Sequence, residues 1–200
     1  MPIRFTSPSL GGQRQVFLQP HEWEFGASYR RLTAHDWFIN NQIQPDSAPG
    51  SQPNRFNIST VDLSLRYGVT EQLSLLLTVP FSTGTNSRIH PAAGRRYVTS
   101  ATGIGDINLV GNLWLLKPST HPGGNVAVGL GVKSASGNNK VEGDLGTATG
   151  TIQFPVHPGL QLGDGGWGMM VQAQGFHRLV GTLSGYFFGS YLLSPRERTD

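Results

Sequence analysis

Residues 61–81 read VDLSLRYGVTEQLSLLLTVPF, and their alternation of apolar and polar residues predicts the fold class. Side chains two residues apart share a face of a strand, so 61–69 and 73–81 each present apolar side chains at odd positions. The polar residues 70–72 predict a turn. Residues whose numbers add to about 142 then face each other, and this even sum places both apolar faces on one side. The hairpin must bury that face against a second sheet or against lipid.

The composition is more typical of a β-barrel than of a soluble domain. Hydrophobic residues make up 37% of the chain, charged residues 14%, and glycine 27 of 200 residues. Few charges with much glycine are unusual in a soluble domain. The chain has no cysteine, so it forms neither a disulfide nor a cysteine zinc site. Its net charge of +3 comes from scattered basic residues, which argues against nucleic-acid binding.

The membrane signals of helical proteins are missing from the sequence. No stretch approaches the roughly 18 to 20 apolar residues of a membrane-spanning helix. Residues 1–20 are rich in Gly, Ser and Pro and lack the apolar core of a secretory signal peptide. We expect 1–20 to be an irregular lead-in, 21–200 to form a partial transmembrane β-barrel, and the signal peptide to have been lost from this chain.

The same period of two residues predicts seven strands. They span about 22–32, 58–69, 73–82, 104–116, 125–134, 166–178 and 183–193. The connections alternate between long loops at 33–57, 82–103 and 134–166 and short turns at 70–72, 117–124 and 179–182. This alternation is expected of an up-and-down barrel with tight turns at one membrane face and extended loops at the other. The fold class that we predict is therefore all-β, an antiparallel meander of an outer-membrane barrel.

One face of these strands is apolar, and we expect it to contact lipid. Its residues are Leu63, Leu65, Leu75, Leu77, Leu109, Leu113, Val126, Val128 and Leu130. Aromatic residues near strand ends are expected to form girdles at the two membrane–water interfaces. Trp23 and Tyr67 belong to the short-turn end, and the long-loop end has Tyr29, Phe81, Trp167 and Tyr191. The face of the last strand stays open, because Phe187 and Phe188 are both large.

The opposite face is polar and is expected to line the lumen. Its residues are Glu24, Arg30, Asp62, Arg66, Asp106, Asn108, Asn112, Lys133, Gln172 and Gln174. They form either a polar pathway for a solute or a ladder of salt bridges that fills a narrow barrel, because unpaired buried charge is costly.

The register of the strands predicts which of these charges pair. A sum of about 90 places Glu24 opposite Arg66 and Ser28 opposite Asp62, with Arg30 diagonal to Asp62. A sum of about 239 places Asp106 opposite Lys133, Leu113 opposite Val126 and Leu109 opposite Leu130.

Nothing in the sequence predicts an enzyme. Histidines 21, 35, 90, 121, 157 and 177 stand far apart, without the spacing of a metal site. The glycine-rich pieces 103–105 and 163–166 are not followed by a helical pattern, so we assign them to turns rather than to a phosphate cradle. We expect no catalytic residue, no metal and no cofactor.

Five strings also carry a resemblance. RYGVTEQLSLLLTVPF, TGIGDINLVGNLWLL, NVAVGLGVKSASGN, LQLGDGGWG and SGYFFGSYLLSPRE, in this order and spacing, resemble the Gram-negative outer-membrane β-barrel family named for the meta-pathway of phenol degradation (MetA-pathway). The resemblance covers residues 55–198. It implies a porin-like outer-membrane transporter that passes hydrophobic or aromatic compounds. The chain departs from the family pattern by lacking a signal peptide and by ending before the later strands, as a fragment would.

The function that we expect is passive transport of small molecules across the bacterial outer membrane. Its partners would be the lipid bilayer and a small-molecule solute, with no nucleic acid, and the sequence does not determine the oligomeric state. One alternative is a structural or adhesive barrel with a plugged lumen and ligand-binding loops, and another is a soluble lipocalin-like binder. An odd number of strands cannot close through antiparallel pairs. We therefore predict an open, curved sheet with free edges at 22–31 and 183–193.

Overall fold

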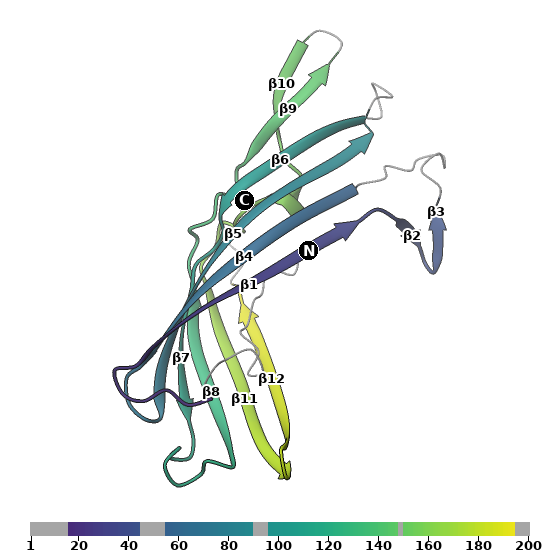
Figure 1. Ribbon diagram of the computed structural model, residues 1–200. Coiled ribbons are helices and arrows are strands. Elements are labelled where there is room, and N and C mark those ends of the chain that lie inside the picture. Colours follow the sequence, from purple (N-terminus) through teal and green to yellow (C-terminus); the bar gives the residue numbers. More distant parts are fainter. Residues whose placement is uncertain (1–15, 45–54, 90–95, 148–149, 195–200) are drawn as a thin grey trace.

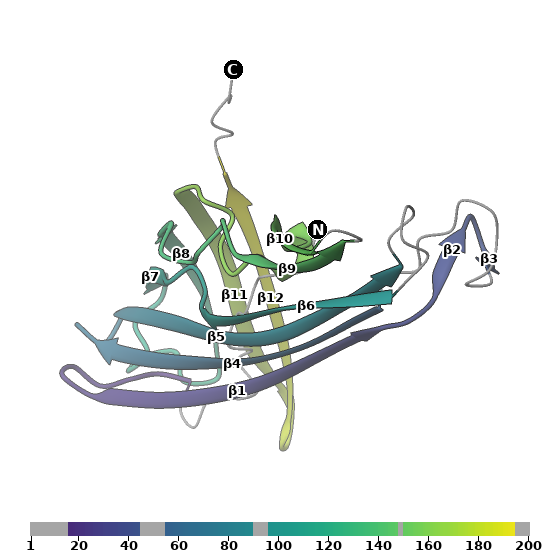
Figure 2. The ribbon, with the colours of Figure 1, turned by 90° about the horizontal axis from the view of Figure 1, so that it is seen from above.

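A computed structural model describes residues 16–44, 55–89, 96–147 and 150–194. Most of these residues are in antiparallel strands, and the main sheet curls into an open half-barrel (Figures 1 and 2). Its strand path is β1 (Trp23–Ala34), β4 (Arg55–Gly68), β5 (Leu73–Ile89), β7 (Asn108–Trp114), β8 (Gly124–Lys133), β11 (Gly168–Val180) and β12 (Leu183–Leu193). β6 (Arg96–Ile104) also pairs with β5. The predicted all-β class and antiparallel meander are confirmed.

The remaining elements are two hairpins and one helical turn at the long-loop end of the sheet. β2 (Trp37–Ile39) pairs with β3 (Gln42–Gln44), and β9 (Glu142–Thr147) pairs with β10 (Gly150–Pro155). The 3-10 helix η2 spans Pro158–Leu160. Within the described residues, no helix is long and apolar enough to cross a membrane.

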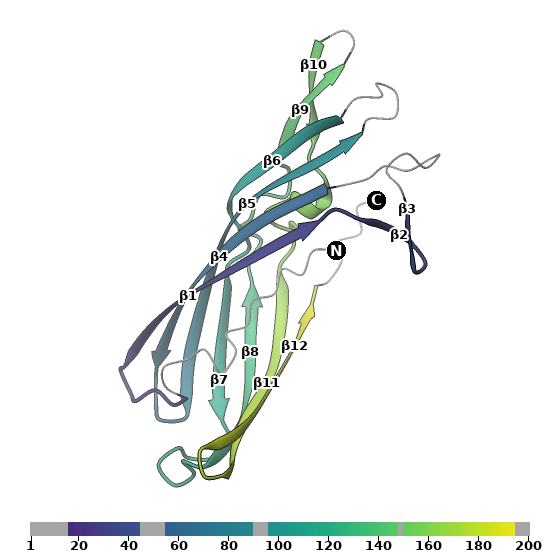
Figure 3. The same ribbon diagram turned by 45° about the vertical axis from the view of Figure 1, so that its right-hand side comes forward.

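The strand path has two free ends, as predicted, and β6, which pairs only with β5, adds a further unpaired edge in the described chain. The strand path begins with β1 and ends with β12, and Figure 3 shows these strands bordering the open side of the half-barrel. Each step along the path is antiparallel, so β1 and β12 run in the same direction. Direct closure would therefore require a parallel pair, which the described part of the chain does not form.

Two of the three predicted registers are confirmed. Glu24 pairs with Arg66 and Ser28 with Asp62, and both pairs follow the predicted sum of 90. Leu65 pairs with Leu77, which follows the predicted sum of 142. The short turn holds this second register, because the Val69 amide donates to the Leu73 carbonyl at 2.8 Å and the Thr70 hydroxyl accepts from the Leu73 amide at 2.9 Å.

The predicted register between β7 and β8 is wrong by two residues. Lys133 lies opposite Asn108 rather than Asp106, and Leu109 and Leu113 lie opposite Val132 and Val128. Asn125 explains the difference, because its side chain accepts from the Leu116 amide at 3.1 Å and donates to the Leu116 carbonyl at 2.8 Å. The turn therefore closes around this side chain. The shift is even, so every side chain keeps its predicted face.

The prediction of a loop at 82–103 is also wrong. β5 continues to Ile89, and β6 pairs with it from Arg96 to Ile104. The sequence STGTNSR at 82–88 offers small and polar side chains on both faces, so no hydrophobic alternation reveals the strand. Hydrogen bonding to β4 on one side and β6 on the other makes it a strand. The β5–β6 hairpin therefore extends well beyond the apolar part of the wall.

A β-bulge separates β6 from β7. Thr78 pairs with Asn108 and Phe81 pairs with Ile104, so two residues of β5 face the three residues 105–107. One of these two residues is Pro80, which has no amide hydrogen to donate, although its carbonyl accepts from the Gly105 amide at 2.8 Å. The predicted single strand 104–116 is thus two strands joined by a bulge. Bulges redirect side chains, and the side chain that this bulge redirects is that of Asp106.

The other two predicted loops contain the small hairpins. β2 and β3 lie within 33–57, of which 45–54 are outside the described residues, and β9, β10 and η2 lie within 134–166. These hairpins pair only locally. Of the predicted lead-in, residues 16–20 are described, and they are irregular as expected. Residues 1–15 and His90 lie outside the described residues.

Candidate lumen-facing polar site

The two faces of the half-barrel differ sharply in polarity. Polar and charged residues outnumber hydrophobic residues among the buried positions of the described chain. We call the face that carries them the concave face, and the opposite face the convex face. Of the ten residues predicted to face the lumen, Asp62, Arg66, Asp106, Asn112, Lys133, Gln172 and Gln174 are buried and Glu24, Arg30 and Asn108 are half-buried.

The convex face is apolar and exposed. Leu130 is 68% and Leu63 54% exposed there. The other predicted lipid-facing residues are also exposed, except that Leu65 and Leu77 are half-buried against each other. The structure places Tyr191 on this face, because it pairs with Val171, and thereby resolves the orientation of β12.

Four of the six predicted aromatic girdle residues lie in two groups, whereas Trp167 immediately precedes β11 and Tyr191 lies near the end of β12. Trp23 and Tyr67 pair across β1 and β4, with ring centroids 4.3 Å apart, near the short turns. Tyr29, Val61 and Phe81 form one row across β1, β4 and β5. This row does not lie at strand ends, as was predicted, because all three strands continue past it. It marks the point where the convex face of β1, β4 and β5 changes from apolar to polar residues.

The first polar cluster joins β1 and β4. The Arg66 Nη2 atom donates to Oε2 of Glu24 at 2.5 Å, and the Arg30 Nε atom donates to Oδ2 of Asp62 at 3.0 Å. The Ser28 hydroxyl donates to the same Asp62 oxygen at 3.4 Å. The two ion pairs follow from the predicted register, because Glu24 is opposite Arg66 and Arg30 is diagonal to Asp62.

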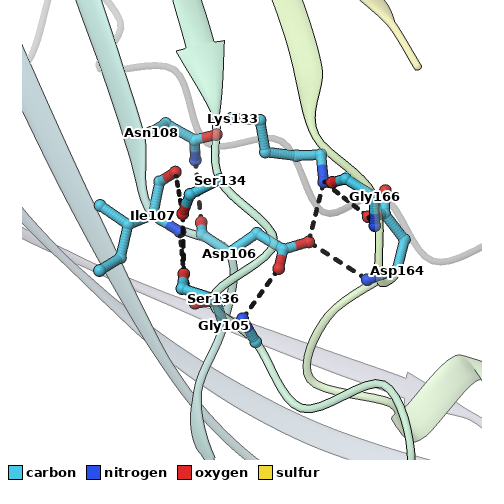
Figure 4. Close-up of polar contacts among 10 residues, drawn as sticks. Gly105, Asp106, Ile107, Asn108, Lys133, Ser134, Ser136, Asp164 and Gly166 are labelled. Carbon is cyan, nitrogen blue, oxygen red and sulfur yellow. Dashed lines mark hydrogen bonds and ion pairs between the residues drawn. The ribbon is translucent and has the colours of Figure 1, made fainter. Parts of the chain in front are cut away.

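The second polar cluster surrounds the bulge and is shown in Figure 4. The Lys133 ammonium donates to Asp106 Oδ2 at 3.1 Å, to Asp164 Oδ1 at 2.6 Å and to the Gly166 carbonyl at 2.6 Å. Asp106 also accepts from the amides of Gly137 at 2.9 Å and Asp164 at 3.2 Å. A buried ammonium is therefore fully coordinated by oxygen atoms, as burial of its charge requires. We call Asp106, Lys133 and Asp164 the latch.

Serine side chains join the same connection to the bulge. The Ser136 hydroxyl accepts from the Ile107 amide at 2.9 Å and donates to the Gly105 carbonyl at 3.1 Å. The Ser134 amide and hydroxyl both donate to the Ile107 carbonyl, at 2.9 and 3.1 Å. These bonds satisfy backbone groups that the bulge removes from the sheet ladder.

Sequence reasoning found Asp106 and Lys133 but missed Asp164 and the serines. Asp164 lies in the glycine-rich piece 163–166, which we assigned to turn formation alone. A carboxylate between glycines, far from any strand, gave no indication of its partner. Only the fold of the long connection brings it to Lys133.

The predicted amides form a separate row. Asn112 pairs with Gly129, and Gly129 pairs with Gln172, so the two amides flank a residue without a side chain. Gln174 lies two residues further along β11, opposite Ala127. The structure does not join these amides to the latch, and it places Asn108 beside the latch, with its amide donating to the Asp106 carbonyl at 3.3 Å.

An aromatic cluster at the short-turn end was also missed. Phe17 packs edge-on against Trp114 and Phe176, with centroids 5.0 and 5.5 Å apart. Leu18 is buried, and Arg66 Nη1 donates to the Val16 carbonyl at 3.4 Å. Residues 16–18 therefore lie against the concave face. The only indication in the sequence was that these residues are apolar, whereas the stretch around them is rich in glycine and proline.

The chemistry of the site is that of hydrogen bonding and charge. Among the described residues, no three His, Asp or Glu side chains are arranged to hold a metal ion. His21 bonds to the Tyr67 hydroxyl and His121 to the Thr120 hydroxyl. His157 accepts from the Gly159 amide at 3.0 Å. Burial and the nearby Arg88 charge lower the pKa of His157.

The fold and site together define an antiparallel half-barrel with a polar concave face. No protein-family model matches the chain, and no curated protein matches it.

Proposed function

We propose that this chain forms part of the wall of a bacterial outer-membrane β-barrel that lets small molecules pass without covalent chemistry. The family resemblance of residues 55–198 supports a place in the MetA-pathway family and a hydrophobic or aromatic solute. The solute crosses along the concave face, and the bilayer contacts the convex face. The chain is not an enzyme and requires no cofactor.

The inverted distribution of polarity carries this proposal. Phe25 is 79% and Leu130 68% exposed on the convex face, whereas Asp62 is 3% and Lys133 6% exposed on the concave face. In water, exposure of so many large apolar side chains on one surface would be unfavourable. Lipid removes that cost, and a polar interior is the usual arrangement of membrane barrels. The proposed lipocalin-like binder requires Leu63, Leu75 and Val128 to point inward, and all three are exposed on the convex face.

Liposome swelling tests the transport function. Liposomes that contain the barrel closed by further strands should swell faster in small neutral solutes than empty liposomes, and an aromatic solute should enter faster than a sugar of equal size. Membrane insertion is checked first by flotation of the protein with the liposomes. Flotation with no gain in permeability for any solute would contradict transport while leaving the membrane location intact.

A specific observation favours a second candidate, the plugged barrel. Phe17 at the short-turn end, and Val156 and Leu160 of the connection at the long-loop end, lie against the concave face. A permanently occupied lumen would make the protein a structural or adhesive barrel whose long loops bind a partner. Flotation without permeability is the result that this candidate predicts.

A further inference from the structure

Part of the connection between β8 and β11 packs against the concave face, while its β9–β10 hairpin projects beyond β6 and leaves β10 exposed (Figures 1 and 3). Its described residues are 134–147 and 150–167. Figure 2 shows β9 and β10 on the inner side of the curl, above β6. An ideal Cβ on Gly143 of β9 would lie 3.3 Å from the Cβ of Thr99 on β6. This proximity places Gly143 of β9 beside β6 of the wall.

An apolar contact attaches the middle of this connection to the sheet. Val156 and Leu160 are 2% and 4% exposed, and they pack with Ala101 of β6. Phe56 and Ile58 of β4 complete the contact. The underside of the connection is therefore a small hydrophobic core that covers the long-loop end of the concave face.

The latch attaches the base of the same connection. Gly137 precedes the covering part and Asp164 follows it, and both are bound to Asp106. Lys133 bonds to both carboxylates. The two points where the chain leaves and rejoins the wall are thus held by one charged cluster, while the covering part between them depends on apolar contacts.

Asn86 has a polar side chain that the closed arrangement leaves unsatisfied. It lies on β5, is 1% exposed, and forms no side-chain hydrogen bond in the described chain. Two residues before it on the same face, an ideal Cβ on Gly84 would lie 2.9 Å from Leu160 Cδ2, and two residues after it Arg88 lies over the Phe154 ring at 5.9 Å. The connection therefore covers Asn86. A buried amide without partners opposes closure, because it would gain hydrogen bonds to water if the cover lifted.

We propose that residues 134–144 and 150–166 form a hinged lid over the long-loop end of the concave face, and that the latch sets how often this lid opens. This inference rests on the proposed function, because the lid would regulate passage of the solute. The apolar contact and the latch hold the lid closed, and the unsatisfied Asn86 favours opening. The lid is thus balanced between two states, with the lumen accessible in one of them.

A disulfide between lid and wall tests the gating role. The chain has no other cysteine, so the double variant Thr99→Cys/Gly143→Cys contains a single possible pair. The separation of 3.3 Å between an ideal Cβ on residue 143 and the Cβ of residue 99 lies just below the range of about 3.5 to 4.5 Å in natural disulfides. The oxidised variant should lower liposome permeability to the level of empty liposomes, and reduction should restore it. Equal permeability before and after reduction would overturn gating, and failure of the folded variant to cross-link would overturn the placement of β9.

A matched disulfide within the wall controls for oxidation itself. Thr60 and Ser82 face each other across β4 and β5, with hydroxyl oxygens 2.8 Å apart. Thr60→Cys/Ser82→Cys joins two strands that are already paired, so its oxidation should leave permeability unchanged. A similar loss in this variant would assign the effect to the wall and would overturn the lid.

A second experiment does not depend on transport. Asn86→Cys places a thiol under the lid, and a water-soluble maleimide reacts with it only when the lid opens. Adding Asp164→Ala should raise the labelling rate about tenfold, equivalent to about 1.4 kcal/mol in the opening equilibrium. Asp144→Ala is the control, because Asp144 is an exposed lid carboxylate that bonds to Gln153 outside the latch.

The two experiments separate the failure of the lid from the failure of the proposed function. Faster labelling with Asp164→Ala, in a protein that never permeabilises liposomes, would support the lid and contradict transport. Equal labelling rates in all three variants, or a rate for Asn86→Cys alone that matches the unfolded chain, would overturn the lid even if the protein transports solutes.

Discussion

Leu65 tests the wall at the scale of a single residue. It faces Leu77 across β4 and β5 on the convex face. If this face contacts lipid near the bilayer midplane, Leu65→Arg or Leu77→Arg should lower the free energy of unfolding by about 2 to 4 kcal/mol. Ser64→Arg should cost much less, because Ser64 points to the polar concave face beside Gly26. Urea titrations in lipid measure the difference, and equal tolerance at all three positions would argue against a membrane wall.

Gly131 on β8 and Gly111 on β7 differ in the space that a side chain would have. A Cβ at Gly131 would lie 2.6 Å from the Leu109 carbonyl oxygen, whereas at Gly111 the nearest atom would be 3.7 Å away. Gly131→Ala should therefore lower the free energy of unfolding by about 1 to 3 kcal/mol, because backbone must move. Gly111→Ala should have little effect. The same urea titrations check this pair, and the prediction is wrong if both variants unfold like the parent protein.

At the scale of an element, His157 in the lid should make the free energy of unfolding depend on pH. The pKa of His157 is lowered by burial and by Arg88, so the folded chain binds fewer protons than the unfolded chain just below pH 6.5. The free energy of unfolding should therefore fall as the pH drops from about 6.5 towards the lowered pKa, and level off below it. His157→Gln should remove this part of the pH dependence. His121→Gln, at the exposed short turn, should retain it, and identical pH profiles for both variants would contradict the assignment.

At the scale of the whole molecule, the open sheet determines which backbone amides exchange their hydrogen with deuterium fastest. β5 and β8 have partners on both sides, whereas β1 and β12 have one each. Amides on the outer edges of β1 and β12 should therefore exchange with deuterium faster than those of β5 and β8 in lipid-reconstituted protein. Slow exchange at both edges would mean that they are paired. Because β1 and β12 run in the same direction, closure through antiparallel pairs takes an odd number of additional strands.

Local alternation by itself determined the class of fold, the two faces and two strand registers. The segment from Val61 to Phe81 predicts how its two strands pair. Its period of two and its short turn are compatible with one register that places apolar residues opposite apolar residues. The charges of β1 and β4 then meet without further information. The identity of the residues on each face followed from the same rule, and the even shift between β7 and β8 did not change it.

Only the tertiary structure decided what lies against the concave face. The extension of β5 and the strand β6 depend on backbone hydrogen bonds between polar segments, which leave no hydrophobic period. Asp164 reaches Lys133 across 31 residues, and Phe17 reaches Trp114 from the other end of the chain. Such contacts arise where the chain folds back on the wall. The local sequence does not predict which residues meet in this way. A carboxylate or an aromatic ring elsewhere in the chain could make the same contact if the fold brought it equally close.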